Sequence, residues 1–223
     1  MSIEILHSQK TSRNHAFKRA FDIFFSLSIL ILGFPLYLIL ILLVRCTSPG
    51  PIFYGGLRMG KNGKLIKCWK FRTMCRDAEG RLQRMLDENP HFREEWEKYF
   101  KLKDDPRLTP IGKFLRKTSL DELPQFWNVL IGDLSVVGPR PIAIERPEEA
   151  EKEIRKHFGD KTDKILSVKP GLTCIWQTCG RNLLTFEERL LLEERYVETQ
   201  SFLLDLALIA KTIPVILLSK GAF

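Results

Sequence analysis

Two adjacent carboxylates, Asp121 and Glu122, are the residues of this sequence best suited to covalent or metal-assisted chemistry. They lie in the stretch RKTSLDELPQFWNVLIGDLSVVGPRP, residues 116–141. An ionised carboxylate can attack an electrophilic centre or bind a divalent cation. The rival interpretation is a helix cap, because Ser119 and Glu122 also fit the S-x-x-E capping box. Their spacing alone favours the cap, so the chemical interpretation depends on the neighbouring residues.

Cations in rigid loops are the first such neighbours. Arg140 lies between Pro139 and Pro141, which restrict the backbone on both sides of a guanidinium suited to bidentate phosphate binding. Two later loops, KPG at residues 169–171 and GRN at residues 180–182, also carry a cation among turn residues. Each of these later loops could equally be an ordinary surface turn.

A second pair of cations is predicted on a strand. The stretch KLIKCWKFRTM, residues 64–74, is rich in residues that favour strands. A period of two places Lys70 and Arg72 on one face, where two cations could bind a diphosphate. A solvated strand face without a ligand is the alternative, and the pattern does not separate the two.

A helix is expected to position the carboxylates. Its apolar residues follow the i, i+3, i+4, i+7 pattern and are Leu123, Phe126, Trp127 and Leu130. This pattern predicts a helix that packs by that face and ends at Gly132. Proline is tolerated only in a first turn, so Pro124 places the start of the helix close to Asp121. Free backbone N–H groups and the helix dipole would then stabilise both negative charges.

The segment between the strand and the carboxylates is expected to be scaffold. Residues 78–101 are charged with apolar residues at helical spacing, and Pro90 divides them into two helices. Asp104, Asp105 and Pro106 are typical of a turn, and a metal role for either acid stays open. The five cysteines form no CxxC pair, so free thiols are expected.

The longest apolar run, residues 23–44, has no charged residue and is long enough to cross a hydrocarbon core of about 30 Å. A cleaved signal peptide is not expected, because a polar leader precedes the run and no small-residue cleavage site follows it. Gly33 and Pro35 interrupt the middle of the run and predict a kink. Basic residues flank both ends, so a hairpin that enters and leaves by one face and a kinked span both remain open.

The C-terminal part and the charge distribution complete this pattern. Phe202 to Leu218 is a second apolar stretch, interrupted by Asp205, Lys211 and Pro214, and is expected either at the membrane interface or in the core. Residues 1–76 contain 12 of the 35 Lys and Arg but only two of the 27 acids. Such a basic excess fits anionic lipid or a phosphorylated ligand. No nucleic-acid motif is present, and too few apolar runs exist for a polytopic carrier.

Taken together, these residues resemble the bacterial sugar transferase family, the monotopic polyprenyl-phosphate phosphoglycosyl transferases. The resemblance runs through nearly the whole chain. Its ordered motifs are KRAFD at residues 18–22, KFRTM, the 116–141 block, KPGLT, WQ, GRN and the closing SKGAF.

The resemblance implies an α/β fold that is mostly helical with a small β element. Residues 1–47 would form a basic leader and a re-entrant membrane helix, and residues 48–223 a cytoplasmic catalytic domain with interfacial amphipathic helices. The implied enzyme transfers a sugar 1-phosphate from a UDP-sugar to undecaprenyl phosphate and releases UMP. It would start a surface polysaccharide or glycoconjugate at the bacterial inner membrane, with its active site facing the cytoplasm. Inner-membrane lipids are implied as partners, and a homodimer stays open.

The resemblance also implies residue roles. Asp121 would be the nucleophile that forms a covalent phosphosugar intermediate, Glu122 would assist at the metal or accept a proton, and both would bind Mg²⁺. Arg140, with Pro139 beside it, would bind the nucleotide-sugar phosphates. Further basic positions that match the family's motifs are Lys70, Arg72, Arg116 and Arg181.

Four positions depart from the family's pattern. Phe34 precedes Pro35 where a serine is common, which leaves the kink angle open, and Glu193 replaces a frequent aspartate. Cys174 and Cys179 stand where small residues are usual. The stretch DDPRLTPIGKFLRKTSLDELPQ resembles the catalytic part of larger members that use hexoses, so UDP-galactose or UDP-glucose is expected. The alternatives are an N-acetylated amino sugar, or a catalytically silent membrane scaffold that binds nucleotide sugars.

Overall fold

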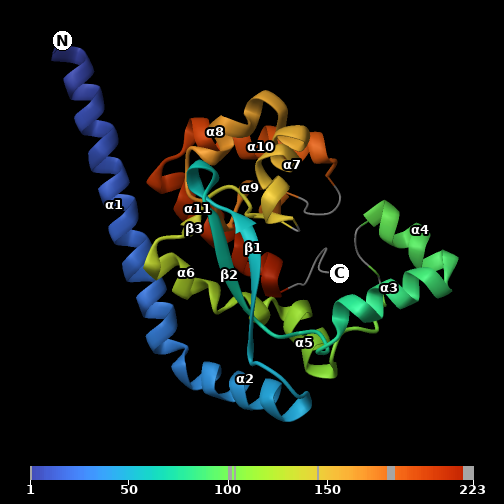
Figure 1. Ribbon diagram of the computed structural model, residues 1–223. Helices are drawn as coiled ribbons and strands as arrows, with labels where there is room; N and C mark the ends of the chain where they lie inside the picture. Colours follow the sequence, from blue (N-terminus) through green and yellow to red (C-terminus); the bar gives the residue numbers. More distant parts are fainter. Residues whose placement is uncertain (1, 100–101, 103, 145, 180–183, 218–223) are drawn as a thin grey trace. The chain divides into compact units, whose positions relative to one another are not determined.

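The computed structural model describes all residues except 1, 100–101, 103, 145, 180–183 and 218–223 (Figure 1). The described chain is mostly helical and contains two small sheets, with strand orders β2-β1-β4 and β3-β5, in agreement with the predicted α/β class. It divides into two compact units. The larger unit consists of residues 1–34, 55–69 and 124–221, and the smaller unit mainly of residues 35–54 and 70–123.

The elements distribute between the units as follows. The larger unit contains α1 (Ser2–Leu32), η1 (Lys61–Gly63), α6 (Gln125–Ile131), β3 (Ser135–Val137), β4 (Ile142–Ala143), η3 (Pro147–Glu149), α7 (Ala150–Phe158), η4 (Gly159–Lys161), α8 (Thr162–Leu166), β5 (Gly171–Thr173), α9 (Ile175–Cys179), α10 (Phe186–Thr199) and α11 (Phe202–Leu217). The smaller unit contains most of α2 (Phe34–Thr47), with α3 (Ala78–Glu88), α4 (Pro90–Tyr99), α5 (Pro110–Thr118) and the 3₁₀ helix η2 (Leu120–Glu122). Strands β1 (Phe53–Met59) and β2 (Leu65–Phe71) have residues in both units. The predicted division of the α3–α4 segment at Pro90 is confirmed.

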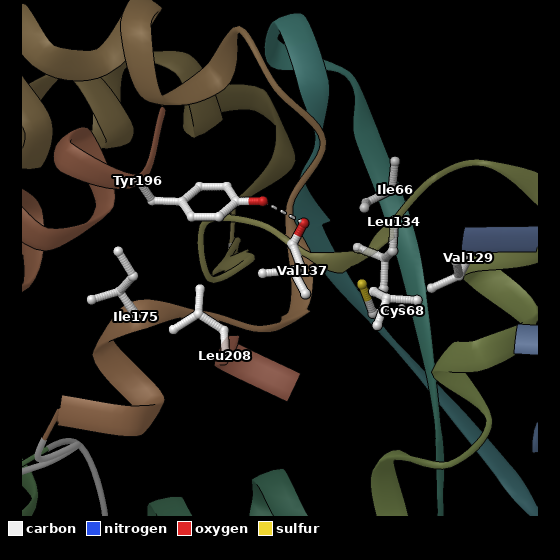
Figure 2. Close-up of a cluster of buried hydrophobic side chains, with 9 residues drawn as sticks. Ile66, Cys68, Val129, Leu134, Val137, Ile175, Tyr196 and Leu208 are labelled. Carbon is white, nitrogen blue, oxygen red and sulfur yellow. Dashed lines mark hydrogen bonds between the residues drawn. The ribbon is translucent and has the colours of Figure 1, made fainter. Parts of the chain in front are cut away.

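The core of the larger unit forms around the parallel pair β3 and β5. All three residues of β3 are buried, as expected for a strand covered on both faces. Figure 2 shows side chains from strand β2 and helices α6, α9, α10 and α11 gathered in this core, with the hydroxyl of Tyr196 directed at the carbonyl of Val137. Tyr196 is fully buried, and its hydroxyl oxygen lies 3.0 Å from this carbonyl and 2.7 Å from the Asp205 carboxylate, two acceptors that share its single proton. The hydrogen bond satisfies a polar group that would otherwise be costly to bury.

Helix α6 packs by a different face from the one predicted. Its buried residues are Gln125, Asn128 and Val129, whereas Trp127 is 54% exposed. Asn128 explains the difference, because its side chain accepts a hydrogen bond from the Trp69 nitrogen and donates one to the Lys67 carbonyl. A polar side chain that pairs with strand β2 in this way has to face inward. The end of the helix at Gly132, in left-handed conformation with φ 91°, is as predicted.

The KRAFD motif attaches α1 to the larger unit. Arg19 donates to the carbonyls of Val129 and Leu130, which lie in the last turn of α6. Lys18 forms a 2.6 Å ion pair with the buried carboxylate of Asp205 in α11. These contacts give the two cations of the motif structural partners in the larger unit.

The third charge of the same motif, Asp22, is buried beside β3. Its carboxylate accepts hydrogen bonds from the Ser135 hydroxyl and the Val136 nitrogen. The acid of α1 that directly precedes the apolar run is therefore paired with a strand of the larger unit.

The smaller unit has its own core, formed by Leu40 and Val44 of α2, Phe71 of β2 and Leu115 of α5. Tyr37 lies beside this core and donates its hydroxyl proton to the Leu123 carbonyl at 2.7 Å. Within this unit, helix α2 therefore packs against the segment that carries the two carboxylates.

The apolar run does not form one continuous helix. Helix α1 ends at Leu32 and α2 begins at Phe34, so the predicted interruption occurs at Gly33. In the described part of the chain no single helix is long and apolar enough to cross a membrane, whereas the pair 15–32 and 34–47, bent by 64°, satisfies length and composition together.

Helix α11 has a buried face and an exposed apolar face, and the membrane-interface interpretation of this stretch stays a prediction. Asp205 and Leu208 are buried in the larger unit. On the same helix Leu203 is 78% exposed and Ile213 is 56% exposed. One face of the helix therefore belongs to the core of the larger unit, and the other face exposes apolar side chains.

Candidate active site

Helix α5 is positioned by its first turn against the strand end that precedes the carboxylates. The Thr109 side chain caps the helix by accepting from the Gly112 nitrogen, and Pro110 occupies the first turn. A Cβ atom at Gly112 would lie only 1.9 Å from the Thr73 carbonyl oxygen, so this close approach requires glycine. The contact fixes where the C-terminal end of α5 presents Arg116.

The turn that carries Asp121 and Glu122 follows directly. Ser119 ends α5 in the left-handed conformation with φ 57°, and the chain then forms η2. Ser119 makes no capping hydrogen bond with its side chain, so the capping box that its spacing suggested is not formed. The helix predicted to begin near Asp121 instead begins at Gln125, because the reversal at Ser119 and the missing N–H of Pro124 delay the regular α-helix.

Lys70 joins the two carboxylates. Its Nζ lies 2.6 Å from Glu122 Oε1 and 3.7 Å from Asp121 Oδ2. The Asp121 side chain is 8% exposed, whereas that of Glu122 is 26% exposed. The two adjacent acids thus have different environments, one buried and one half-buried, because neighbouring residues point in different directions around a helical turn.

Burial dominates the electrostatics of Asp121. Desolvation raises the pKa of Asp121 to about 6, the neighbouring Glu122 charge adds to this effect, and Lys70 and Arg116 oppose it. Arg116 is itself held in place by a hydrogen bond from its Nε to the Thr73 hydroxyl at 3.0 Å. Burial lowers the pKa of Arg116, while the charge of Asp121 raises it. A buried carboxyl flanked by two cations is typical of a functional group rather than a surface ion pair.

The carboxylates fit a magnesium site in which water and substrate supply the remaining ligands. Mg²⁺ is commonly held by one or two carboxylates together with waters and substrate phosphates, rather than by a complete set of protein ligands. Asp121 and Glu122 offer two such carboxylates, one of them partly exposed. No group of three or more potential metal-ligating side chains occurs in the part of the chain that the structure describes.

Arg72, predicted to act beside Lys70, lies elsewhere in the smaller unit. Its guanidinium donates to the carbonyls of Val44, Ser48 and Pro51, near the end of α2. Gly50, with φ 122°, leaves room for it, since a Cβ there would lie 2.8 Å from Arg72 Nη1. This position indicates a structural role, and phosphate binding by Arg72 stays a prediction.

Pro139 and Arg140 belong to the larger unit, where their loop is bonded to the KPG loop. The Gly138 nitrogen donates to the Thr173 carbonyl, and the Gly171 nitrogen donates to the Pro139 carbonyl. A Cβ at Gly138 would lie 2.4 Å from the Lys169 carbonyl oxygen, so the two loops can approach only because glycine is present. The predicted binding residue Arg181 and the closing SKGAF, residues 219–223, lie outside the described residues.

Two features near the predicted residues were missed from the sequence. Asp105 and Arg107 form a buried pair, joined by two side-chain hydrogen bonds of 2.8 and 2.7 Å, close enough for both charges to act on Arg116. Trp176 of α9 has two guanidiniums over its ring, those of Arg140 and Arg189. The D-P-R spacing of Asp105 and Arg107 could have indicated an Asx-type turn closed by an ion pair. Nothing in the local sequence indicated the two arginines over Trp176.

Comparison with known proteins identifies the family. The model of the bacterial sugar transferase family matches residues 13–219. The chain belongs to the bacterial sugar transferase family. The match covers both carboxylates, both units and the bent helix pair, so the resemblance inferred from the motifs is confirmed.

Several relatives of the family are similar along most of this chain. It is 42% identical over 223 residues to the undecaprenyl-phosphate galactose phosphotransferase of Salmonella typhimurium, covering 100% of this chain and 45% of the relative. It is 42% identical over 206 residues to the exopolysaccharide production protein ExoY of Sinorhizobium fredii, covering 92% of this chain and 88% of the relative. The UDP-glucose:undecaprenyl-phosphate glucose-1-phosphate transferase of Klebsiella pneumoniae is 37% identical over 227 residues, covering 99% of this chain and 44% of the relative. The chain thus spans less than half the length of the Salmonella and Klebsiella relatives.

Proposed function

We propose that the chain transfers a sugar 1-phosphate from a UDP-sugar to a polyprenyl phosphate such as undecaprenyl phosphate, with release of UMP. The observation that carries this proposal is the buried Asp121 with Glu122 beside it and with Lys70 and Arg116 acting on both charges. A carboxylate held between cations can approach a negatively charged phosphate that would otherwise repel it. The family and the names of its relatives support the same substrates.

The reaction proceeds in two displacements at one phosphorus. A carboxylate oxygen of Asp121 attacks the sugar-bearing phosphorus, the bond to the bridging oxygen breaks, and UMP leaves with that oxygen. An oxygen of the polyprenyl phosphate then attacks the same phosphorus and restores the Asp121 carboxylate. Lys70 offsets part of the negative charge of the Asp121–Glu122 dyad before the donor enters, and Arg116 keeps a positive charge beside Asp121 during attack. Bound Mg²⁺ would supply further charge neutralisation at the donor phosphates, held by Asp121 and Glu122.

The donor sugar is proposed to be galactose or glucose. The names of the Salmonella and Klebsiella relatives specify these two sugars for those proteins. An N-acetylated amino sugar is the alternative outcome of a donor panel. The ExoY relative, which this chain nearly spans, is named for exopolysaccharide production, and this supports a role in surface polysaccharide synthesis.

UMP release tests the proposal. Detergent-purified protein is incubated with Mg²⁺, undecaprenyl phosphate and each of a panel of UDP-sugars, with Asp121→Asn and Glu122→Gln as variants. We expect one sugar to give UMP that depends on lipid, on Mg²⁺ and on Asp121, with a loss of at least about 1,000-fold in Asp121→Asn, as for loss of a covalent nucleophile. Binding of UDP-sugars without any turnover in the folded protein would instead favour a silent scaffold.

The bent pair α1–α2 is proposed to enter the cytoplasmic face of the bacterial inner membrane and to leave by the same face. Support comes from the break at Gly33 and from the apolar side chains exposed on both helices, among them Phe24, Leu32 and Leu42. Cys46, which is exposed near the end of α2, is a native probe for labelling. The second labelling position is a cysteine introduced by Ser2→Cys before the helix pair, in a variant that has no other accessible thiol. Labelling of the two positions from opposite faces of sealed vesicles would exclude the hairpin.

A further inference from the structure

A second cluster of charges lies in the larger unit, around the indole of Trp176 in α9. The guanidinium carbons of Arg140 and Arg189 lie 5.0 and 5.3 Å from the centroid of this ring. Both distances are typical of cation–π interactions. The indole therefore brings together two like charges from separate segments, the loop after β3 and helix α10.

Glu193 is the counter-charge of this cluster. Its side chain is 2% exposed, and its Oε1 accepts a hydrogen bond from the Arg140 backbone nitrogen at 3.2 Å. The same oxygen lies 3.9 Å from Arg189 Nε. Arg189 and Glu193 are four residues apart on α10, so they share one helix face. One buried carboxylate thus orients the backbone of the first arginine and the side chain of the second.

The cluster is incomplete in charge and in hydrogen bonds. Two guanidiniums face one carboxylate, which leaves an excess positive charge. Among the described residues, Glu193 Oε2 and Arg189 Nε are buried without a hydrogen-bond partner. The neighbouring Cys174 thiol adds no negative charge, because burial and the Glu193 charge raise its pKa. Buried polar groups are seldom left unpaired, so the unpaired Arg189 nitrogen points to an acceptor that binds from outside the chain.

We propose that Glu193 positions Arg140 and Arg189 as a pair of guanidiniums that binds a phosphate group, with Arg189 as a second phosphate-contacting residue. Guanidiniums present planar sets of N–H donors that match phosphate oxygens, and the negative charge of a phosphate would offset the excess positive charge. The source of the phosphate rests on the proposed function. It is either the diphosphate of the nucleotide-sugar donor or the phosphate of the polyprenyl acceptor.

Replacement of Arg189 tests the contact in the full-length, detergent-purified protein. KM and kcat are measured for UDP-galactose and for undecaprenyl phosphate, and equilibrium binding is measured for UDP and for undecaprenyl phosphate in the Asp121→Asn background. We expect Arg189→Met to weaken binding of one of the two about tenfold or more, as for a lost charge-assisted hydrogen bond. Loss of UDP binding identifies the donor as the source, and loss of lipid binding identifies the acceptor.

The matched control is Arg195→Met, the same replacement at an exposed position of the same helix, and it should change neither affinity. Arg189→Lys keeps the charge without the planar fork and should show a smaller loss for the same ligand. It decides the outcome if Arg189→Met does not fold. Unchanged binding of both ligands in the folded Arg189 variants overturns the proposal.

A double-variant cycle tests the positioning role of Glu193. Glu193→Gln keeps an oxygen for the Arg140 nitrogen but removes the charge that attracts Arg189. We expect Glu193→Gln to weaken binding of the same ligand. This effect should disappear in the Arg189→Met background, because Glu193 then has no second guanidinium to hold. An effect of equal size in both backgrounds overturns the positioning role. Because UDP binding needs no turnover, the cycle remains informative if no UDP-sugar yields UMP.

Discussion

At the scale of single residues, the burial of Asp121 carries a cost in stability. Its carboxylate is buried, and the pKa of about 6 lies above the ordinary value of 3.8. Ionising this group at neutral pH therefore opposes folding, since the unfolded chain ionises it more easily. In the proposed reaction the same burial makes Asp121 a better nucleophile, because a poorly solvated carboxylate attacks phosphorus more readily.

Asp121→Asn is therefore expected to stabilise the metal-free protein. At pH 7 in EDTA we expect a gain of about 1–3 kcal/mol in the free energy of unfolding, because roughly two pKa units correspond to about 3 kcal/mol and some of the ion pairing with Lys70 is lost. Denaturant unfolding in detergent measures it. Glu122→Gln is the control, since it removes the 2.6 Å pair with Lys70 from a more exposed site and should give no gain.

The sign of the pH dependence follows from the raised pKa. Between about pH 4 and 6 the folded protein holds the Asp121 proton while the unfolded chain has released it, so this term stabilises at low pH and is lost as the pH rises through 6. The stability difference between the Asn variant and the wild type should accordingly shrink as the pH falls from 7 to 5. A wild type that is more stable than Asp121→Asn at pH 7 would contradict this account.

At the scale of elements, one amide determines how α6 packs. Asn128 has no exposed surface and bonds the backbone of β2 through both of its side-chain groups. Asn128→Ala would leave the Trp69 nitrogen and the Lys67 carbonyl without these partners. We expect a loss of about 2–4 kcal/mol in the free energy of unfolding. Trp127→Ala, at an exposed position of the same helix, should cost less than about 1 kcal/mol, and equal losses in the two variants would argue against this role of Asn128.

Helix α5 depends on a contact between two backbones. Because a Cβ at Gly112 would overlap the Thr73 carbonyl, Gly112→Ala has to displace the helix that carries Arg116. We expect a loss of stability above about 2 kcal/mol, as for overpacking against rigid atoms, together with a loss of turnover. At Gly80 a Cβ would meet only the Asp77 side chain, which can move. Gly80→Ala should thus be neutral or stabilising by about 0.5–1 kcal/mol in helix α3, and similar unfolding midpoints for the two variants would refute the argument.

At the scale of the whole molecule, buried charges connect the beginning of the chain to its end. The Asp205 carboxylate is paired with Lys18 and also accepts the Tyr196 hydroxyl. Lys18→Met would leave this buried carboxylate without its cation, so we expect a loss of about 3–5 kcal/mol. In the double variant Lys18→Met, Asp205→Asn the charge is removed as well, and part of the loss should be recovered. Strictly additive losses in urea unfolding would show that the pair is not coupled.

Pro90 as a helix boundary and Gly132 as a helix end were predictable from sequence because each depends on local chemistry. Proline lacks a donor, and glycine adopts positive φ easily. The buried face of α6 was not predictable by the same rules. Its apolar pattern indicated Trp127, whereas the hydrogen bonds of Asn128 to β2 require a partner about 60 residues away in the chain.

Sequence alone was sufficient for the family, for the mixed class and for the presence of a bent apolar segment, since these depend on composition and on ordered motifs. Packing in three dimensions was needed to separate Lys70, which bonds the dyad, from Arg72, which bonds the loop after α2. It was also needed to bring Arg189 and Glu193 to Arg140. Charge pairing depends on distances of a few ångströms between residues far apart in the chain, and no local spacing encodes those distances.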